Sequence, residues 1–451
     1  MVVHEWGTFT ALQDDQGRTI GAINSDDEPV PKFVHRISGT AKGVPLSDLT
    51  PSFESKAIKP NHPDVTMRLE TPGIYFYPPS GQKTPATVDV RVDFNGGWLS
   101  EFYPMAQAVA PDLPNPQVAY PSLGIGTHSS LEWKGLQVGV TGIPVETRDH
   151  VWITPREVKA ALVKSPMENA KSYSRKVVNE PEKFLFYRGV GHLDSPLRVT
   201  RNEKSHTLQI FGHFDVGKIG GQLNPQDFQT ADGWLVEIRR DGACAFRSIG
   251  SLDYLSQKNG AQPLREIPGI FEEKEFSKAW LAELQEVMRK ALVKDGLFDD
   301  EAAAMLKTWE LSYFKSPGLR LFYIVPHAWT DRVLTLTISG HPEIKRVMVG
   351  RIELITNEQR ELLKRIAAGP CPDLVALRQK YQQMVREYPK VWDDLVCGKK
   401  SLADIGIKAP PLYQDYLNLG RFRNALLLDE QKERPAAPLE AFIKANHLRA
   451  R

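Results

Sequence analysis

Two segments of the chain that could form a metal site repeat the pattern glycine, histidine, apolar residue, aspartate. They are residues 191–194 and 212–215. Imidazole and carboxylate groups are common protein ligands of zinc, manganese and iron, so one divalent metal is expected if the two segments meet. The candidate metal ligands in them are His192, Asp194, His213 and Asp215. The alternative is a ladder of histidine and aspartate side chains that faces solvent.

A β-hairpin would bring these segments together, because a turn at residues 202–205 lies midway between them. If Arg201 pairs with His206, all four candidate ligands project from one face of the hairpin. Pro196 interrupts one strand, so the metal site requires a hairpin that continues past this proline.

A histidine and a glutamate also open the chain, in the run His4-Glu5-Trp6-Gly7-Thr8-Phe9-Thr10. In a strand, the even-numbered residues of this run share one face and the odd-numbered residues share the other. His4 could act as a metal ligand or general base together with His35 or Glu70. The alternative is a histidine that only makes a hydrogen bond at a strand start. Because the run is too polar and aromatic for a frayed terminus, we expect it to pair into a sheet, with His4 lining a cavity.

Two further carboxylates lie close to aromatic residues. Glu101 is two residues before Tyr103, and Glu70 comes shortly before a Tyr-Phe-Tyr run. A sugar site needs this combination, since rings stack on the apolar faces of sugars and acids bind hydroxyls or protonate a glycosidic oxygen. The alternative is that each carboxylate is paired with an arginine, such as Arg68 or Arg188. The candidate catalytic residues are His4, Glu5, Glu70, Glu101, Tyr103 and Arg188.

The run at residues 4–10 resembles the signature of a family of exported, functionally uncharacterised bacterial proteins that open with HEWGTFT just after their signal peptide. The resemblance covers most of the chain. It implies a periplasmic or secreted location with the signal peptide removed, and it implies no activity. Other segments similar to recurrent segments of that family are residues 70–77, 98–104, 184–189, 319–323 and 346–351.

Composition and missing motifs exclude several classes of protein. The chain has 451 residues, 41% hydrophobic and 25% charged, which is enough for a large core. Its formal charge of +2 does not indicate a nucleic-acid partner. No run of about 18 apolar residues predicts a transmembrane segment. The GxSxG, P-loop and HExxH motifs are absent, and no nucleotide cofactor is expected. The oligomeric state is left open.

Three scattered cysteines predict that any bound metal has histidine and carboxylate ligands rather than thiolates. Cys244 lies in an apolar, strand-like run and is expected to be a buried, reduced thiol. Cys371 and Cys397 flank a probable helix. We expect these two to form a disulfide if the protein is exported.

The pattern of elements predicts an α+β fold. We expect a β-rich, sandwich-like unit at residues 1–165, a second β-unit with inserted helices at 166–357, and a helical unit at 358–451. The leading functional hypothesis is an exported, metal-assisted hydrolase acting on an extracellular or cell-envelope substrate, either a small molecule or a glycan. The alternative is a non-catalytic protein that binds glycans or the cell envelope.

Overall fold

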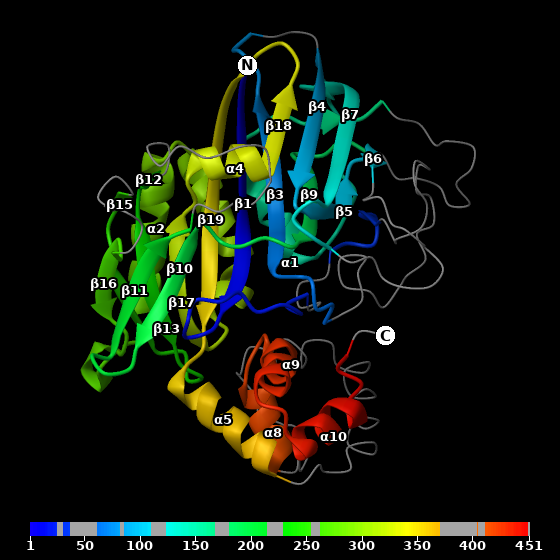
Figure 1. Cartoon of the computed structure of the whole chain (residues 1–451). Helices are drawn as coiled ribbons and strands as arrows, with labels where there is room; N and C mark the ends of the chain where they lie inside the picture. Colours follow the sequence, from blue (N-terminus) through cyan, green and yellow to red (C-terminus); the bar gives the residue numbers. More distant parts are fainter. Residues whose placement is uncertain are drawn as a thin grey trace.

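The computed structural model shows an α+β fold, as the sequence predicts (Figure 1). A broad central sheet lies between a smaller sheet and a layer of helices, and further helices pack at one end. The structure describes residues 1–24, 30–36, 61–81, 85–109, 123–166, 180–213, 229–253, 262–369, 404 and 411–449.

The N-terminal strand is the fifth of nine strands in the central sheet, so the expectation that it pairs into a sheet is confirmed. It pairs in parallel with β19 and antiparallel with β3. The nine strands lie in the order β14 (Cys244–Ser248), β13 (Gly233–Ile238), β17 (Gly318–Ile324), β19 (Glu343–Leu354), β1 (Val2–Gln13), β3 (Met67–Tyr77), β9 (Leu185–Gly191), β5 (Gly97–Tyr103) and β2 (His35–Arg36).

This sheet contains strands from both sides of the expected boundary near residue 165. β1, β3, β5 and β2 come from the first predicted unit, whereas β9, β13, β14, β17 and β19 come from the second. The two sets are interleaved by hydrogen bonding, so they share one sheet.

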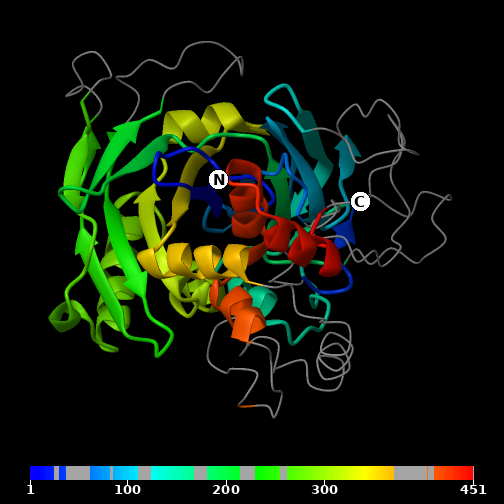
Figure 2. The same cartoon turned by 60° about the horizontal axis from the view of Figure 1, so that its bottom comes forward.

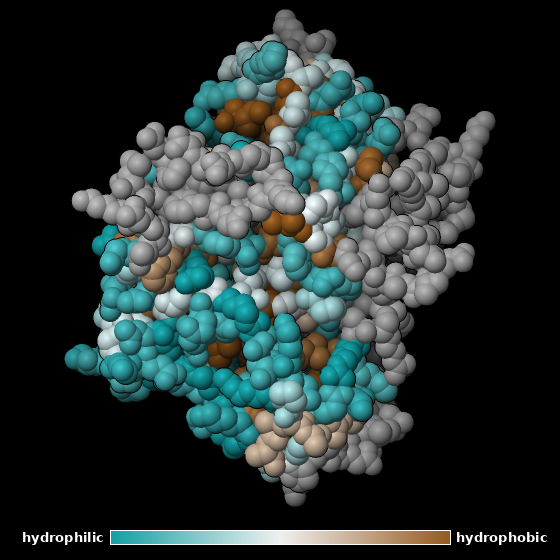
Figure 3. Space-filling model, viewed as in Figure 1, coloured by the Kyte–Doolittle hydropathy of each residue, from teal (hydrophilic) through white to brown (hydrophobic). Residues whose placement is uncertain are grey.

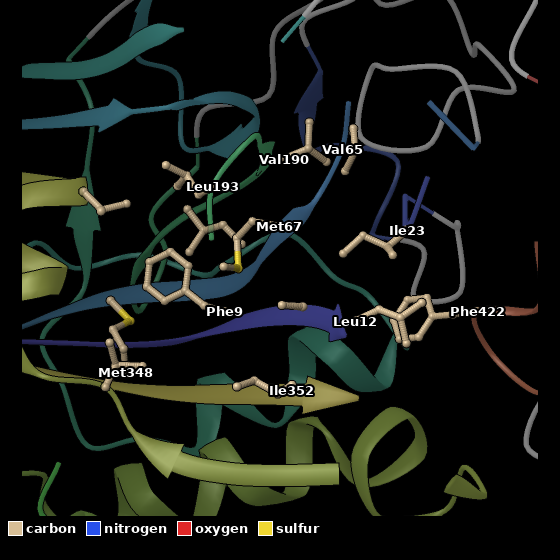
Figure 4. Close-up of a cluster of buried hydrophobic side chains, with 14 of the residues drawn as sticks. Phe9, Leu12, Ile23, Val65, Met67, Val190, Leu193, Met348, Ile352 and Phe422 are labelled. Atoms are coloured by element: carbon tan, nitrogen blue, oxygen red, sulfur yellow. The ribbon is translucent and has the colours of Figure 1, made fainter. Parts of the chain in front are cut away.

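A second, five-stranded sheet packs on one face of the central sheet. Its strands are β18 (Leu334–Ile338), β4 (Ala86–Asn95), β7 (His128–Val138), β6 (Gln107–Val109) and β8 (Val163–Lys164). β4 alternates as the sequence predicts, with Val88, Val90 and Val92 buried. These valines join the core cluster that contains Phe9 of β1, which lies beside Met67 and Met348 in Figure 4.

Helices cover the other face of the central sheet. They are α1 (His150–Ile153), the 3₁₀ turn Pro155–Glu157, α2 (Trp280–Lys294), α3 (Asp299–Thr308) and the π-helical turn Glu310–Phe314. Side chains from the sheet and from these helices form a second cluster of buried hydrophobic residues. In this cluster, Trp6 of β1 packs with Trp309 and with Leu284 and Met288 of α2. Trp6 and Phe9, an even-numbered and an odd-numbered residue of β1, therefore enter different layers, as the strand pattern predicts.

A third sheet contains the hairpin on which the predicted metal site depends. It consists of β10 (Leu197–Asn202), β11 (Thr207–Gly212) and β16 (Arg265–Pro268), and the short strands β12 (Gln229–Thr230) and β15 (Leu252–Asp253) pair nearby. The predicted register is wrong: Asn202 pairs with Thr207, so Arg201 does not pair with His206. The Asn202 side chain accepts hydrogen bonds from the backbone N–H groups of Lys204 and Ser205, which fixes the turn. Arg201 consequently pairs with Leu208, two positions beyond the predicted partner.

The C-terminal helices lie across one end of the sheets (Figures 1 and 2). They are α5 (Asn357–Ala368), α8 (Pro411–Asn418), α9 (Arg423–Glu433) and α10 (Ala437–Ala445), and α4 (His327–Val333) lies apart from them between β17 and β18. Gly420, with φ of +87°, separates α8 from α9. Phe422 between these helices joins the cluster of Leu12 and Ile23, which Figure 4 shows beside it.

None of the helices in the described ranges is both long and apolar enough to cross a membrane. On the face shown in Figure 3, hydrophobic patches are small and separated by hydrophilic residues. Cys244 is buried with a free thiol, as predicted, and burial raises its pKa to about 11. Cys371 and Cys397 lie outside the described residues, so their disulfide stays a prediction.

Candidate functional site

His4 is buried in the sheet and lines none of the three pockets described below, so its place in a cavity stays a prediction. Its Nδ1 atom lies 2.6 Å from Oε2 of Glu301 on α3. The rings of Tyr77 and Phe298 pack against the imidazole and fill the space around it. Because Glu301 also accepts the Phe298 N–H at 2.8 Å, its carboxylate joins the start of α3 to β1.

Glu5 points to the opposite face of β1 and is bonded on both oxygens. Arg346 Nε donates to Oε2 at 2.5 Å, and the Tyr187 hydroxyl donates to Oε1. Arg346 also donates to Asp331 at 2.7 Å. Burial, followed by the nearby charge of Glu5, raises the pKa of Tyr187 far above its ordinary value. His4 and Glu5 therefore belong to two separate networks.

The alternative interpretation of Glu70 and Glu101 is confirmed, because each is paired with the arginine that the sequence suggested. Arg68 Nη2 lies 2.5 Å from Glu70 Oε1, and Arg188 Nε donates to Glu101. Tyr313 also contacts Glu70, with its hydroxyl 3.2 Å from Oε2. All of these side chains are buried, so neither carboxylate faces an open site.

His35 stacks near Tyr103, with ring centroids 5.8 Å apart. It is 4% exposed, and within the described part of the chain neither ring nitrogen has a hydrogen-bond partner. Burial lowers the pKa of His35 to about 4. Of the predicted catalytic residues and His35, the structure joins Glu101 with Arg188 and His35 with Tyr103. The partners described for His4, Glu5 and Glu70 are residues outside this set.

Three of the four hairpin residues line one pocket of about 580 Å³, namely His192, Asp194 and His213. They do not project from one hairpin face, because His192 follows β9 of the central sheet and Asp194 precedes Pro196 and β10. Asp215 lies outside the described residues. Among the residues that the structure describes, no three histidine, cysteine, aspartate or glutamate side chains are placed to hold a metal ion.

A larger pocket of about 750 Å³, the outer pocket, lies between the β13–β14 hairpin and helices α5 and α8. Its charged groups include three arginines and Glu237, and its apolar walls include Phe271 and Phe276. It is lined by Arg201, residues 237–241, 269–271, Phe276, residues 317–319, residues 356–359, Gln414 and residues 417–420. The N-terminus of α5 borders it, and a capping box between Thr356 and Gln359 fixes the start of this helix, as predicted.

Glu237 differs from the arginines of the outer pocket in its lack of a paired side chain among the described residues. The pocket's arginines are paired with carboxylates: Arg201 with Asp15 at 3.1 Å, Arg239 with Glu273 at 2.8 Å and Arg240 with Glu358 at 2.7 Å. Glu237 is half-buried and has no hydrogen-bond partner in the described ranges. Burial raises its pKa, and the charges of Arg239 and Arg201 oppose that shift.

A much smaller inner pocket of about 10 Å³ adjoins the outer one, since Pro317 and Gln359 line both. Three arginines face it from β17, β19 and the turn between α8 and α9. It is lined by Leu12, Ser316, Pro317, Arg320, Arg351, Glu353, Leu354, Gln359, Arg421, Phe422 and Leu426.

Sequence reasoning missed the residues of both pockets. The available signal was a charged residue inside an apolar strand run, as with Glu237 after Leu235-Val236 and Arg320 inside Leu319 to Tyr323. Such a residue is rarely buried without a specific partner or role.

No protein-family model matches the chain, and no curated protein shows significant similarity to it. The resemblance of residues 4–10 to an exported family therefore stays a prediction.

Proposed function

We propose that the protein binds a small hydroxylated ligand, of the sugar class, in the outer pocket. The observation that carries the proposal is the carboxylate of Glu237, which lines this pocket and has no hydrogen-bond partner among the described residues. The neighbouring arginines already have carboxylate partners. The group left to be satisfied is therefore an acceptor, and ligand hydroxyls are suitable donors.

The size and walls of the outer pocket support the same ligand class. A volume of about 750 Å³ lies within the usual range for small-molecule sites. Phe276 and Leu417 add apolar surface to the pocket wall, and the Arg239 guanidinium packs over the Phe276 ring, 3.5 Å from its centroid. An exported location, which only the resemblance implies, belongs to this proposal as well.

Binding is favoured over glycoside hydrolysis, because hydrolysis uses two carboxyl groups on opposite sides of the scissile bond. The other acids of the outer pocket are engaged within the protein. Asp241 accepts the Ala243 N–H at 2.9 Å, and Glu358 is paired with Arg240. One available carboxylate suits recognition, which agrees with the alternative hypothesis from the sequence.

A metal-assisted hydrolase is the second candidate function, because His192, Asp194 and His213 line one pocket. His192 Nδ1 lies 2.8 Å from the Asp64 carbonyl oxygen, a contact that would leave Nε2 to bind a metal. Elemental analysis of the purified protein tests it. We expect a bound metal to be lost in His213→Ala, and a metal-free wild-type protein, or undiminished metal in the variant, would reject this function.

Calorimetric titration with a panel of neutral mono- and oligosaccharides tests the main proposal. We expect Glu237→Gln to weaken the binding of any hit about 10- to 100-fold, because hydrogen bonds to a charged group are lost. The matched control is Glu266→Gln on β16, whose carboxylate is exposed and bonded to Thr207 and Gln209. A panel without any hit, or equal affinity in the wild type and Glu237→Gln, would overturn the proposal.

A further inference from the structure

We propose that the inner pocket binds a single small inorganic anion of the halide type, with chloride as the natural ligand. This site is separate from the sugar site and does not depend on it. The inference rests on two buried arginines that share one carboxylate, on the unsatisfied donors of one of them, and on the size of the cavity.

The first observation is an excess of buried positive charge. Arg320 is 0% exposed and Arg351 is 1% exposed. Their Nε atoms lie 3.0 Å and 2.5 Å from the same oxygen, Oε1 of Glu353. Two guanidinium groups therefore face one carboxylate in the described part of the protein. Buried charges are tolerated when they are paired, so this arrangement favours a further negative charge.

The second observation is that the two arginines differ in how their terminal nitrogens are satisfied. Arg320 donates from Nη1 to the Tyr313 carbonyl at 2.5 Å and from Nη2 to the Ser316 carbonyl at 2.9 Å. Neither Nη atom of Arg351 makes a hydrogen bond to any described residue, although Nη2 is close to Glu353. The Tyr313 ring lies 4.2 Å from Arg351 Cζ, which attracts the cation but accepts none of its N–H groups in a hydrogen bond.

The cavity beside Arg351 has the right position and charge for an anion. Arg320, Arg351 and Arg421 line it together with one carboxylate, that of Glu353. Arg421 is paired with Glu70 at 3.2 Å, so Arg351 is the arginine that supplies the available donors. Burial lowers the pKa of Arg320 to about 10. The charge of Glu353 opposes this shift, and the charges of Arg351 and Arg421 add to it.

The size of the cavity selects the class of anion. A volume of about 10 Å³ is close to the space that one water molecule needs. Phosphate, sulfate and organic carboxylates have several heavy atoms and are too large, so a monatomic anion is the class closest in size to this space. An anion here would connect β17 and β19 of the sheet with Phe422 at the start of α9.

Thermal unfolding of the whole chain in sodium chloride and in sodium gluconate, at equal ionic strength, tests the proposal. We expect chloride and bromide to raise Tm by about 2 °C in a saturable way, and sulfate to have no such effect. Arg351→Lys should lose the halide effect, because lysine keeps the charge but not the forked donors. Arg265→Lys on exposed β16 is the control and should retain it.

Crystals grown in sodium bromide give a readout that needs no variant. An anomalous peak beside Arg351 Nη1, together with the halide dependence of Tm, supports the site. Water without an anomalous signal, a peak without any halide dependence (an adventitious ion only), or halide dependence that is unchanged in Arg351→Lys would each overturn it. If Arg351→Lys does not fold, the wild-type melting and diffraction data decide. The sugar titration is independent, so the two proposals can fail separately.

Discussion

Strand β1 and the outer pocket differ in whether their polar side chains have hydrogen-bond partners. In β1, every residue from Val3 to Gln13 is buried, and His4 and Glu5 each have a close partner from another element. In the outer pocket, Glu237 is half-buried and meets no donor within the described ranges. The polar and aromatic run at residues 4–10, which is the most conspicuous in the sequence, is thus buried. The carboxylate that lines the outer pocket, that of Glu237, lies in a strand with no conspicuous motif.

This difference teaches that chemically suggestive residues can serve the fold. Glu5 holds Arg346, and through it the contact with Asp331, where β1 meets β19. Glu301 holds His4 and the first turn of α3. In both cases a buried carboxylate joins side chains from neighbouring elements and so helps to hold these elements together.

The largest expected effect comes from breaking the β1 network. Glu5→Ala leaves Arg346 buried without its main partner, and we expect the free energy of unfolding to fall by about 3–5 kcal/mol. Urea denaturation measures the loss. The control is Glu343→Ala at the exposed start of β19, where a surface pair with Lys345 should contribute less than about 1 kcal/mol. A loss in Glu5→Ala no greater than in the control would contradict the structural role of this network.

The second effect depends on pH and concerns His35. Its pKa is lowered from 6.5 to about 4 in the folded protein, so the unfolded chain takes up a proton first as the pH falls. Stability should decrease by about 3 kcal/mol between pH 6.5 and pH 4 and then level off. His35→Phe keeps the ring contacts and should remove this part of the decrease. Unfolding curves of the wild type and of His35→Phe, measured across that pH range, test this prediction. Parallel pH profiles of the two proteins would contradict it.

A third, smaller effect links the two regions through helix α5. Thr356 accepts the Gln359 N–H at 3.1 Å, and Thr356→Ala should cost about 1 kcal/mol of stability. Because this turn borders the outer pocket, we also expect weaker sugar binding. Thr337→Ala on exposed β18 should leave both measurements unchanged. If Thr356→Ala lowers the stability but leaves sugar binding unchanged, the start of α5 does not contribute to the ligand site.

The smallest effect is expected at Glu237, in contrast with Glu5. The raised pKa means that burial disfavours the charged carboxylate, so wild-type stability is lost as the pH rises through the folded pKa. Glu237→Gln should therefore unfold within about 0.5 kcal/mol of the wild type at neutral pH, with any change a gain, and should show no gain well below pH 4. A large loss at neutral pH would mean that Glu237, like Glu5, serves the fold.

The parts of the fold that depend on local pattern were predictable. The valines of β4, the two faces of β1 and the capping box at Thr356 all follow from spacing within a few residues. The hairpin register was not predictable, because it depends on the Asn202 side chain folding back on the turn. A shift of two residues changes every cross-strand pair.

The candidate site could not be predicted for a different reason. The outer pocket combines residues from β10, β13, the segment that follows β16, and helices α5 and α8, and its lining spans about 220 positions of the sequence. Nothing in the sequence near Glu237 indicates that Arg201 or Phe276 will be its neighbour. The arginine partners of Glu70 and Glu101 were predictable, because Arg68 is local and Arg188 lies in a recognisable strand run.

The parallel pairing of β1 with β19 has a consequence for the order of events during synthesis. Residues 2–13 are synthesised about 340 positions before their parallel partner at residues 343–354. β3 can cover one edge of β1 early, but the other edge keeps unpaired N–H and C=O groups throughout that interval. Nascent chains that end before β19 therefore expose an apolar, aromatic strand edge, and aggregation or chaperone binding is most expected in that period.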